Sequence, residues 1–374
     1  MRIGIDARVL DRGITGTGRY LMNLLCEIPK IDTENEYFLF TNSNLNKYEK
    51  FYKIIDVKNK FLPSKIFSVL WPHLVLPFKL KKHKIDIYFT PNIILPLFTN
   101  KKISYIPVLH DIIPLLHKTF YPFSYRTYLK MLLPVTFKKA DLVITVSSHS
   151  KKDIVKYFNL PESKVDIVYA NAQEKFKPIS LSDEQKKEII KQYNLPKKYV
   201  LYVGAIDYRK NISCIIKTAE RLKEKNVDMA FVLIGKCFYS DKSIFNEIEE
   251  KKEYIRYINF MDDNHLPLIY NMAFCFLFPS YYEGFGIPPL EAMQSAIPTI
   301  TSNNSSLPEV VGDGGILVDA DDYISIADEI EKLYYSPDVY NSYKVRALEA
   351  SKKYSAQKST KKLVEIFNNI KKGK

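Results

Sequence analysis

Cysteine is scarce in this sequence, and the few cysteines lie far apart. The 374 residues include four, with no Cys-x-x-Cys pair and no cysteine–histidine cluster at zinc spacing: Cys26, Cys214, Cys237 and Cys275. This pattern excludes a disulfide scaffold and a zinc ribbon, and it favours a reducing compartment. The chain is 46% hydrophobic, so it can bury a sizeable core. At about 100 to 200 residues per domain, its length suggests two domains or one large one.

Long apolar runs are also missing. A helix that crosses a bilayer needs about 20 apolar residues. The most hydrophobic stretch, 61–80, is interrupted by three prolines, two lysines and a histidine. The sequence runs from Met1 straight into an apolar segment, without the pattern of a secretory signal. We therefore expect a cytoplasmic protein that does not span a membrane.

Negative charge is scarce in one part of the chain. The net charge is +13, and residues 51–152 hold 17 Lys and Arg against four Asp and Glu, whereas the remainder holds 38 of each. The excess indicates either a functional basic face or the solvated lysines of a lysine-rich protein. A functional face of this kind would suit nucleic acid, a negatively charged membrane surface or an acidic substrate.

Short apolar runs alternate with helix-like stretches along the whole chain. Ten runs have the length and composition of buried strands: 2–6, 37–41, 85–89, 103–109, 142–146, 199–203, 229–234, 255–260, 274–278 and 298–301. This alternation predicts an α/β fold of two doubly wound domains, each with helices on both faces of a parallel sheet. Ligands of such folds bind beyond the carboxyl ends of the strands.

A polar stretch between the two series of runs sets the domain boundaries. We predict a first domain over 1–172, a linker over 173–196 and a second domain over 197–354. An amphipathic C-terminal helix over 355–374 could pack back on the first domain.

Two candidate sites follow strands of the first domain. Gly16 and Gly18 lie in a glycine-rich loop that opens a helix, where backbone N–H groups can meet a phosphate. A plain flexible loop is the alternative, and the dinucleotide fingerprint G-x-G-x-x-G is absent. His110 and Asp111 directly follow the run 103–109, which places an imidazole and a carboxylate where ligands bind. Asp111 could instead cap the next segment.

A pair of cations opens the second domain. Arg209 and Lys210 follow the run 199–203 at the start of a helix, where they can clamp a diphosphate. Two solvated loop cations are the alternative.

Two carboxylates eight positions apart form the most specific pattern. Glu283 lies in a glycine-flanked turn after a strand, and Glu291 lies in the first turn of a helix that begins at Pro288 or Pro289. Glu283 can accept sugar hydroxyls, and Glu291 can take a ribose diol or merely favour the helix dipole. Four backbone N–H groups can meet a phosphate: those of Gly284, Phe285, Gly286 and Ile287.

In combination these motifs resemble the retaining glycosyltransferases of family 4, whose two facing Rossmann-like domains form the GT-B fold. The resemblance rests on the two glutamates, the Arg209–Lys210–Asn211 segment, the glycine-rich loop and the His110–Asp111 pair. It extends through 147–153 and 302–310, so it covers most of the chain. The pattern is most similar to bacterial mannosyltransferases that build surface polysaccharides.

The resemblance implies an enzyme without metal or cofactor that moves a sugar, with mannose from GDP-mannose as the first expectation, to a saccharide or lipid-linked saccharide. Arg209 and Lys210 would neutralise the diphosphate, Glu291 would bind the ribose and Glu283 would orient the sugar. His110 would hydrogen-bond the donor sugar, with Asp111 nearby. UDP- and dTDP-sugars stay open as donors. Retention could use a covalent intermediate or same-face attack, and we favour the latter.

Two other functions stay open. A nucleic-acid-binding protein would explain the basic segment, but the sequence has no RNP, KH or helix-turn-helix pattern, so we expect no nucleic-acid partner. A nucleotide-sugar epimerase of the same fold would release free nucleotide or altered sugar without an acceptor. No cluster of acids or histidines suggests a metal site, since the Asp262–Asp263 pair precedes a helix as a cap.

Four lysines close behind apolar residues suggest a membrane contact. Lys79, Lys81, Lys82 and Lys84 follow Trp71, Leu74, Leu76 and Phe78. Apolar and cationic side chains mix in this way at a membrane interface. We predict peripheral attachment to the anionic inner face of the plasma membrane through these lysines. The alternative is a buried core from Trp71 to Phe78 with the lysines as its solvated edge.

Overall fold

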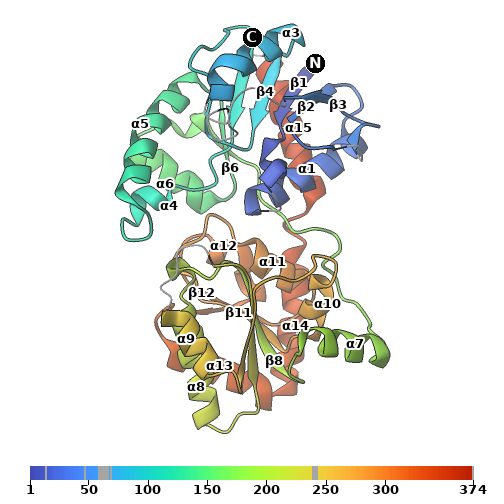
Figure 1. Ribbon diagram of the computed structural model, residues 1–374, viewed down its shortest axis with the longest axis vertical. Coiled ribbons are helices and arrows are strands. Elements are labelled where there is room, and N and C mark those ends of the chain that lie inside the picture. The colour runs from blue at the N-terminus through green and yellow to red at the C-terminus, as the bar shows by residue number, and fades with distance from the viewer. Residues whose placement is uncertain (13–14, 46–47, 58–66, 68–69, 238–242, 373–374) are drawn as a thin grey trace. The chain divides into compact units, whose positions relative to one another are not determined.

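The computed structural model describes residues 1–12, 15–45, 48–57, 67, 70–237 and 243–372. The chain divides into two compact units (Figure 1). The first comprises Met1–Asn171 and Ala356–Lys374, and the second comprises Ala172–Ser355. The stretch 173–196, which we expected to be a linker, therefore belongs to the second unit. There Ile179 donates its N–H to the Asn271 side chain at 2.8 Å.

The first unit is built on a five-stranded parallel sheet in the order β3-β2-β1-β4-β5. Its strands are β1 (Arg2–Asp6), β2 (Glu36–Thr41), β3 (Lys53–Asp56), β4 (Ile87–Thr90) and β5 (Ser104–Pro107). A bridge from Val108 to Ile144 leads to the parallel pair β6 (Val143–Thr145) and β7 (Val165–Ile167). The helical elements are η1 (Arg8–Arg12), α1 (Gly16–Ile31), η3 (Trp71–Val75), α3 (Leu76–Lys82), α4 (Ile113–Leu116), α5 (Phe123–Lys139), α6 (Ser148–Phe158) and η4 (Glu162–Lys164).

The C-terminal helix α15 (Ala356–Lys372) also packs in the first unit, against α1. Its buried face includes Leu363 and Phe367, and the Phe367 ring meets the Phe89 ring edge-on at 5.8 Å. The Ser359 hydroxyl donates to the Tyr169 carbonyl at 2.8 Å. The last segment of the chain thus completes the core that the first segment begins.

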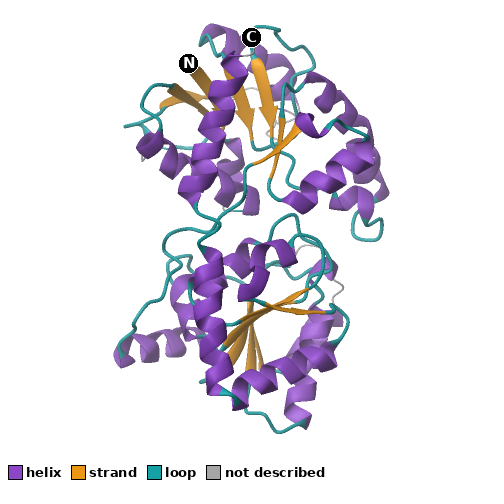
Figure 2. Ribbon diagram, turned by 180° about the vertical axis from the view of Figure 1, so that it is seen from behind, coloured by secondary structure: helices purple, strands orange, loops and turns teal. Residues whose placement is uncertain are grey.

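The second unit contains a six-stranded parallel sheet in the order β10-β9-β8-β11-β12-β13. Its strands are β8 (Tyr199–Val203), β9 (Ala230–Ile234), β10 (Ile255–Ile258), β11 (Cys275–Phe278), β12 (Thr299–Ser302) and β13 (Ile316–Val318). Its helical elements are α7 (Asp183–Tyr193), η5 (Tyr208–Lys210), α8 (Ile212–Glu224), α9 (Ser243–Glu250), α10 (Leu266–Met272), α11 (Ile287–Gln294), α12 (Leu307–Val311), η6 (Gly312–Gly314), α13 (Tyr323–Tyr335) and α14 (Pro337–Ser351). In each unit helices cover both faces of the sheet (Figure 2), as the alternating pattern predicts.

The candidate residues follow the carboxyl ends of strands, as this architecture requires. His110 comes after β5 in the first unit, whereas Arg209 follows β8 and Glu283 follows β11 in the second. Since β8 and β11 are hydrogen-bonded neighbours, their loops emerge side by side at one edge of the sheet. None of the helices in the described ranges has the length and apolar content that a membrane crossing requires.

Candidate active site

The loop after β8 is a capped turn that fixes Arg209 and Lys210. The Asp207 carboxylate accepts the Lys210 N–H at 3.2 Å and starts η5. Asn211 ends the turn in the left-handed conformation, with φ of 55°, and its amide donates to the Ala320 carbonyl at 2.6 Å. Asparagine tolerates this conformation better than most residues. The turn is therefore held at both ends before α8 begins.

Both cations pair with Glu283, which belongs to the loop after β11. The Lys210 Nζ lies 2.5 Å from Glu283 Oε1, and the Arg209 Nη1 lies 2.9 Å from Glu283 Oε2. Lys210 is 7% exposed and Glu283 8%. The Arg209 guanidinium also donates to the Tyr282 carbonyl at 2.9 Å. The structure thus joins three residues that sequence reasoning placed on different parts of the substrate.

The pKa directions in this cluster follow from one carboxylate being shared by two cations. Burial would raise the pKa of Glu283, but the attraction of Arg209 and Lys210 outweighs it and holds the pKa below its usual value. Burial and then repulsion by Arg209 lower the pKa of Lys210, and Glu283 only partly opposes them. Glu283 is therefore firmly ionised, while the two cations partly destabilise each other.

Two serines after β12 hold the Glu283 loop in place. The Glu283 N–H donates to the Ser305 hydroxyl at 2.8 Å, and the Ser306 hydroxyl lies 2.9 Å from the Glu283 carbonyl and 2.7 Å from that of Phe285. We did not predict this supporting role. The only signal for it was that both serines fall in the 302–310 segment of the family resemblance.

A glycine turn leads into α11. Gly286 has φ of 110°, and a Cβ there would lie 2.9 Å from Leu307 Cδ2, so glycine is required. Helix α11 then begins with Ile287 followed by two prolines, which have no N–H. Of the first three residues of α11 only Ile287 has an N–H, and the other three expected donors, those of Gly284, Phe285 and Gly286, precede the helix.

Glu291 lies in the second turn of α11 rather than the first, because the helix begins at Ile287. The influence of the helix dipole falls off within the first turn, which weakens the purely dipolar explanation for this residue. Glu291 is 2% exposed, and Oε2 accepts the hydroxyl of the buried Tyr270 at 3.0 Å. Its carboxylate is thus oriented by a specific donor.

His110, in the first unit, is a neutral imidazole. Burial lowers its pKa to about 4, although a hydrogen bond to the Pro91 carbonyl works in the opposite direction. The Tyr20 ring of α1 meets the histidine ring edge-on, with centroids 5.3 Å apart. Among the described side chains, its Nε2 is one of the buried atoms without a hydrogen-bond partner.

The neighbours expected to act with His110 are partly engaged in local structure. The Asp111 carboxylate accepts the Ile113 N–H at 3.0 Å, which is the capping role left open by the sequence. Gly16 opens α1, and a Cβ there would meet nothing within 4 Å. The Gly18 N–H donates to the Thr15 side chain at 3.2 Å. Gly18 therefore serves the helix cap rather than offering a free donor, and residues 13–14 of this loop lie outside the described residues.

A metal site is not evident in the described ranges, where no group of three or more His, Cys, Asp or Glu side chains is placed to hold an ion. The Asp262 carboxylate accepts the Asn264 N–H at 2.8 Å, while Asp263 pairs with Lys175. The N-cap of α10 is His265, so the acidic pair lies just ahead of the cap position that we expected it to fill.

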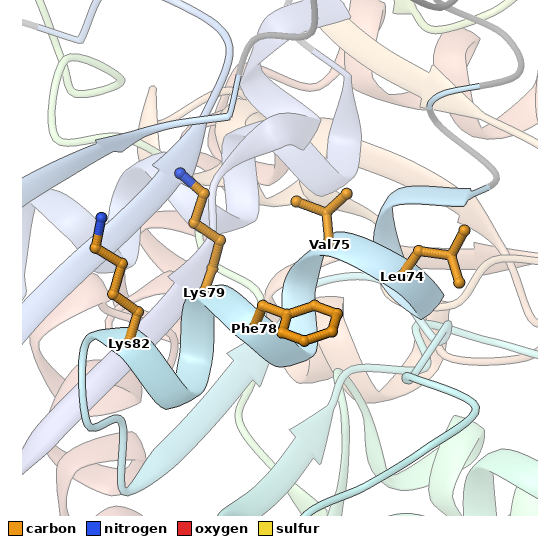
Figure 3. A pocket seen from close by; sticks show the side chains of 5 residues that line it. All are labelled: Leu74, Val75, Phe78, Lys79 and Lys82. Atoms are coloured by element: carbon orange, nitrogen blue, oxygen red, sulfur yellow. The ribbon is translucent and has the colours of Figure 1, made fainter.

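Residues 71–84, which include the four lysines expected at the membrane, have a buried and an exposed side. Trp71 and Leu76 are fully buried, whereas Leu74 is 55% and Phe78 75% exposed. Leu74, Phe78 and Lys79 line a shallow pocket together with Val75 and Lys82 (Figure 3). The other two lysines, Lys81 and Lys84, are exposed. The buried-core alternative therefore holds for the inner side only.

Both halves of the chain match models of known protein families. Residues 14–170 match the family model Glycosyltransferase Family 4, and residues 184–350 match Glycosyl transferases group 1. The chain belongs to the family 4 glycosyltransferases. This confirms the resemblance found in the sequence.

Individual relatives agree with that assignment. The glycosyltransferase is 27% identical to O-antigen chain mannosyltransferase B of Escherichia coli, over 98% of this chain and 99% of that protein. It is 28% identical to O-antigen chain mannosyltransferase RfbU of Salmonella typhimurium, over 90% and 93%. The structure of a sucrose-phosphate synthase from Thermosynechococcus elongatus superposes with a TM-score of 0.78 at 17% identity and covers both chains completely. The fold is GT-B, as expected.

Replacing Glu283 with glutamine should destabilise the glycosyltransferase. The change leaves the buried Lys210 ammonium without its counter-charge, for which the usual cost is about 3 to 5 kcal/mol, whereas Arg209 keeps Asp207 at 3.8 Å. Urea unfolding followed by circular dichroism should detect the loss. The matched control is Glu249→Gln, because Glu249 makes an exposed pair with Lys252 at 2.7 Å and should change stability by less than about 0.5 kcal/mol.

The same variant should also respond differently to acid. A carboxylate with a lowered folded-state pKa adds stability above its unfolded pKa, and that stability disappears as pH falls through the folded value. As pH falls through the folded-state pKa of Glu283, wild type should lose the stability that the ionised carboxylate contributes. Glu283→Gln has no carboxylate at this position and should not show that loss. Equal acid sensitivity of the two proteins would contradict the shared-carboxylate cluster.

Proposed function

We propose that this glycosyltransferase transfers a sugar from a nucleotide-sugar donor to a saccharide or lipid-linked saccharide acceptor in surface polysaccharide synthesis. GDP-mannose is the donor that we favour, because two relatives over nearly the whole chain are O-antigen mannosyltransferases. The observation that carries the proposal is the buried cluster of Arg209, Lys210 and Glu283 at the carboxyl ends of β8 and β11. Ligands of doubly wound sheets bind at such an edge.

Charge neutralisation of the leaving group is the main catalytic effect that we assign to the site. Arg209 and Lys210 stabilise the negative charge that develops on the departing diphosphate, and a dry, preorganised setting strengthens that interaction. Glu283 accepts hydroxyls of the donor sugar, and Glu291 accepts the ribose diol. His110, being neutral, contributes a hydrogen bond to the sugar rather than a positive charge.

Same-face attack is the route to retention that we favour. A covalent intermediate needs a carboxylate free to reach the anomeric carbon. The two candidates are engaged elsewhere, since Asp111 accepts the Ile113 N–H and Glu283 is shared by two cations. The departing phosphate would then take the proton of the acceptor hydroxyl as the new bond forms on the same face.

The proposed reaction is tested with purified full-length enzyme, a lipid-linked saccharide acceptor and a panel of GDP-, UDP- and dTDP-sugars. Mannose transfer from GDP-mannose with an α-linked product is the expected result, and activity should survive EDTA because paired cations neutralise the diphosphate. Turnover of a different donor alone would overturn the mannose assignment. Altered free sugar formed without acceptor would indicate an epimerase. Loss of activity on EDTA treatment, restored by a divalent ion, would show that a metal is required.

The clamp predicts a loss of affinity that depends on phosphate. Arg209→Ala and Lys210→Ala should each weaken GDP binding by roughly 1 to 3 kcal/mol, the range for hydrogen bonds to charged groups. Guanosine should bind wild type and both variants equally in calorimetry. Arg256→Ala is the control, because this exposed arginine donates only to the Tyr193 carbonyl at 3.3 Å in the described contacts. The same loss for guanosine as for GDP would contradict the clamp.

We also propose that the protein is cytoplasmic and attaches to the anionic inner membrane face through Lys79, Lys81, Lys82 and Lys84. Each lysine near such a surface contributes about 1 kcal/mol, and the attraction weakens as salt rises. Changing all four to glutamine should therefore lower sedimentation with anionic liposomes and flatten its dependence on salt. A variant that sediments like wild type at every salt concentration would contradict this attachment.

A further inference from the structure

A largely buried ion pair lies at the end of the first strand of the first unit. The Arg8 guanidinium donates to the Asp6 carboxylate through Nε at 2.9 Å and through Nη2 at 2.7 Å. The Tyr88 hydroxyl donates to the same carboxylate at 3.2 Å. The Asp6 side chain is 2% exposed and the Arg8 side chain 16%. The function proposed above assigns no role to either residue.

The pair occupies the position at which this kind of sheet binds ligands. In the order β3-β2-β1-β4-β5, the chain moves outward from β1 on one side and then returns to build β4 and β5 on the other. The direction therefore changes between β1, which ends at Asp6, and β4, which carries Tyr88. Doubly wound sheets bind ligands at such a switch point, beyond the carboxyl ends of the strands. The Arg8–Asp6 pair thus marks a candidate ligand site in the first unit.

One nitrogen of Arg8 is left for a ligand. Asp6 takes Nε and Nη2, and none of the described residues accepts a hydrogen bond from Nη1. Since Nη1 is not fully buried, a ligand can reach it. The guanidinium also lies over the ring of the buried Trp71, 5.0 Å from the ring centroid. The carboxylate and the ring hold this planar group in place, so its remaining N–H groups point in fixed directions.

The charges around Arg8 favour an uncharged ligand. Burial by itself would lower the pKa of Arg8, but the attraction of Asp6, and more weakly of Asp11, outweighs burial and raises it. Two carboxylates therefore act on one cation here, whereas the second unit sets two cations around Glu283. A phosphate or carboxylate at this site would be repelled by the excess negative charge. A hydroxyl group can accept from Nη1 without that repulsion.

The site lies on the same sheet edge as His110. Strand β4 has β1 on one side and β5 on the other. Neighbouring strands are about 4.8 Å apart, so the ends of β1 and β5 are separated by about 10 Å. The His110 side chain, after β5, is hydrogen-bonded to the Pro91 carbonyl, directly after β4. A saccharide ring bound by Arg8 would therefore lie close to the sugar that we assign to His110.

We propose that Arg8 binds the acceptor of the transfer by donating from Nη1 to a hydroxyl of an uncharged saccharide end. Asp6 is a positioning residue, because it acts by holding the guanidinium. The surplus of carboxylates makes the site select against acceptor ends that carry a phosphate or a carboxylate. The inference rests on the proposed function for the statement that the acceptor is a saccharide, and it adds the residue that recognises it.

Saccharide binding to the full-length enzyme tests the role of Arg8. The probe is an α-linked mannobiose, chosen because two relatives are O-antigen chain mannosyltransferases, and binding is followed by NMR titration. Arg8→Lys keeps a positive charge opposite Asp6 but removes the planar group, and it should weaken mannobiose binding at least tenfold. The matched control is Arg2→Lys at the amino end of the same strand, where Arg2 donates to the His83 carbonyl at 3.1 Å. The control should bind like wild type. Equal affinity of wild type and Arg8→Lys, or no binding by wild type, would overturn the proposal.

Monodeoxy analogues of mannobiose separate hydroxyl recognition from a structural role. Wild type should lose at least tenfold in affinity for one of these analogues, a result that does not depend on whether a variant folds. Arg8→Lys should bind that analogue and mannobiose equally, whereas a structural role would weaken all ligands by the same factor and would overturn the proposal. A mannobiose 6-phosphate that wild type binds more tightly than mannobiose would assign the site to an anion and overturn the uncharged class.

The same measurements distinguish this inference from the proposed function. They record saccharide binding and need no transfer reaction. Failure to transfer sugar from any donor would reject the proposed function while the binding results still decide the role of Arg8. Transfer that proceeds with equal acceptor KM in wild type and Arg8→Lys would reject the role of Arg8 alone.

Discussion

The Glu283 carboxylate pairs with Arg209 through one oxygen and with Lys210 through the other, and the site of the second unit depends on these two ion pairs. The two cations lie in the loop after β8 and the carboxylate lies in the loop after β11. The ion pairs therefore connect the loops of two neighbouring strands. Ser305 and Ser306 connect the same loop to the segment after β12. Three loops at one sheet edge are thereby fixed by charge and hydrogen bonds. Removing the single carboxylate would break the ion pairs between the β8 and β11 loops, whereas the contacts of Ser305 and Ser306, which involve the Glu283 backbone, would remain.

The repeated α/β architecture could be predicted because buried parallel strands are continuous apolar runs. All ten predicted runs overlap strands of the structure. The strands that we missed are β3, β7 and β13. They have only three or four residues, and β3 and β13 lie at sheet edges. Such strands carry too few apolar residues to form a recognisable run.

The candidate residues could be found from the sequence, but their partners could not. Position after a strand was enough to indicate His110, Arg209 and Glu283. The pairing of Lys210 with Glu283 spans 73 residues and depends on which strands are neighbours. No local pattern contains that information. In the same way, the place of Arg8 at the switch point of the first sheet depends on the strand order, which only the folded unit reveals.

The internal ion pairs also bear on how the proposed clamp would release its product. A site with two unpaired buried cations would hold a nucleoside diphosphate very tightly, and slow product release limits many enzymes. Here the Glu283 carboxylate already neutralises part of the positive charge of both cations. An incoming diphosphate shares them with this carboxylate, and a departing one leaves them neutralised. The built-in anion thus lowers the affinity of the proposed clamp for the departing diphosphate, which favours turnover over retention of nucleotide.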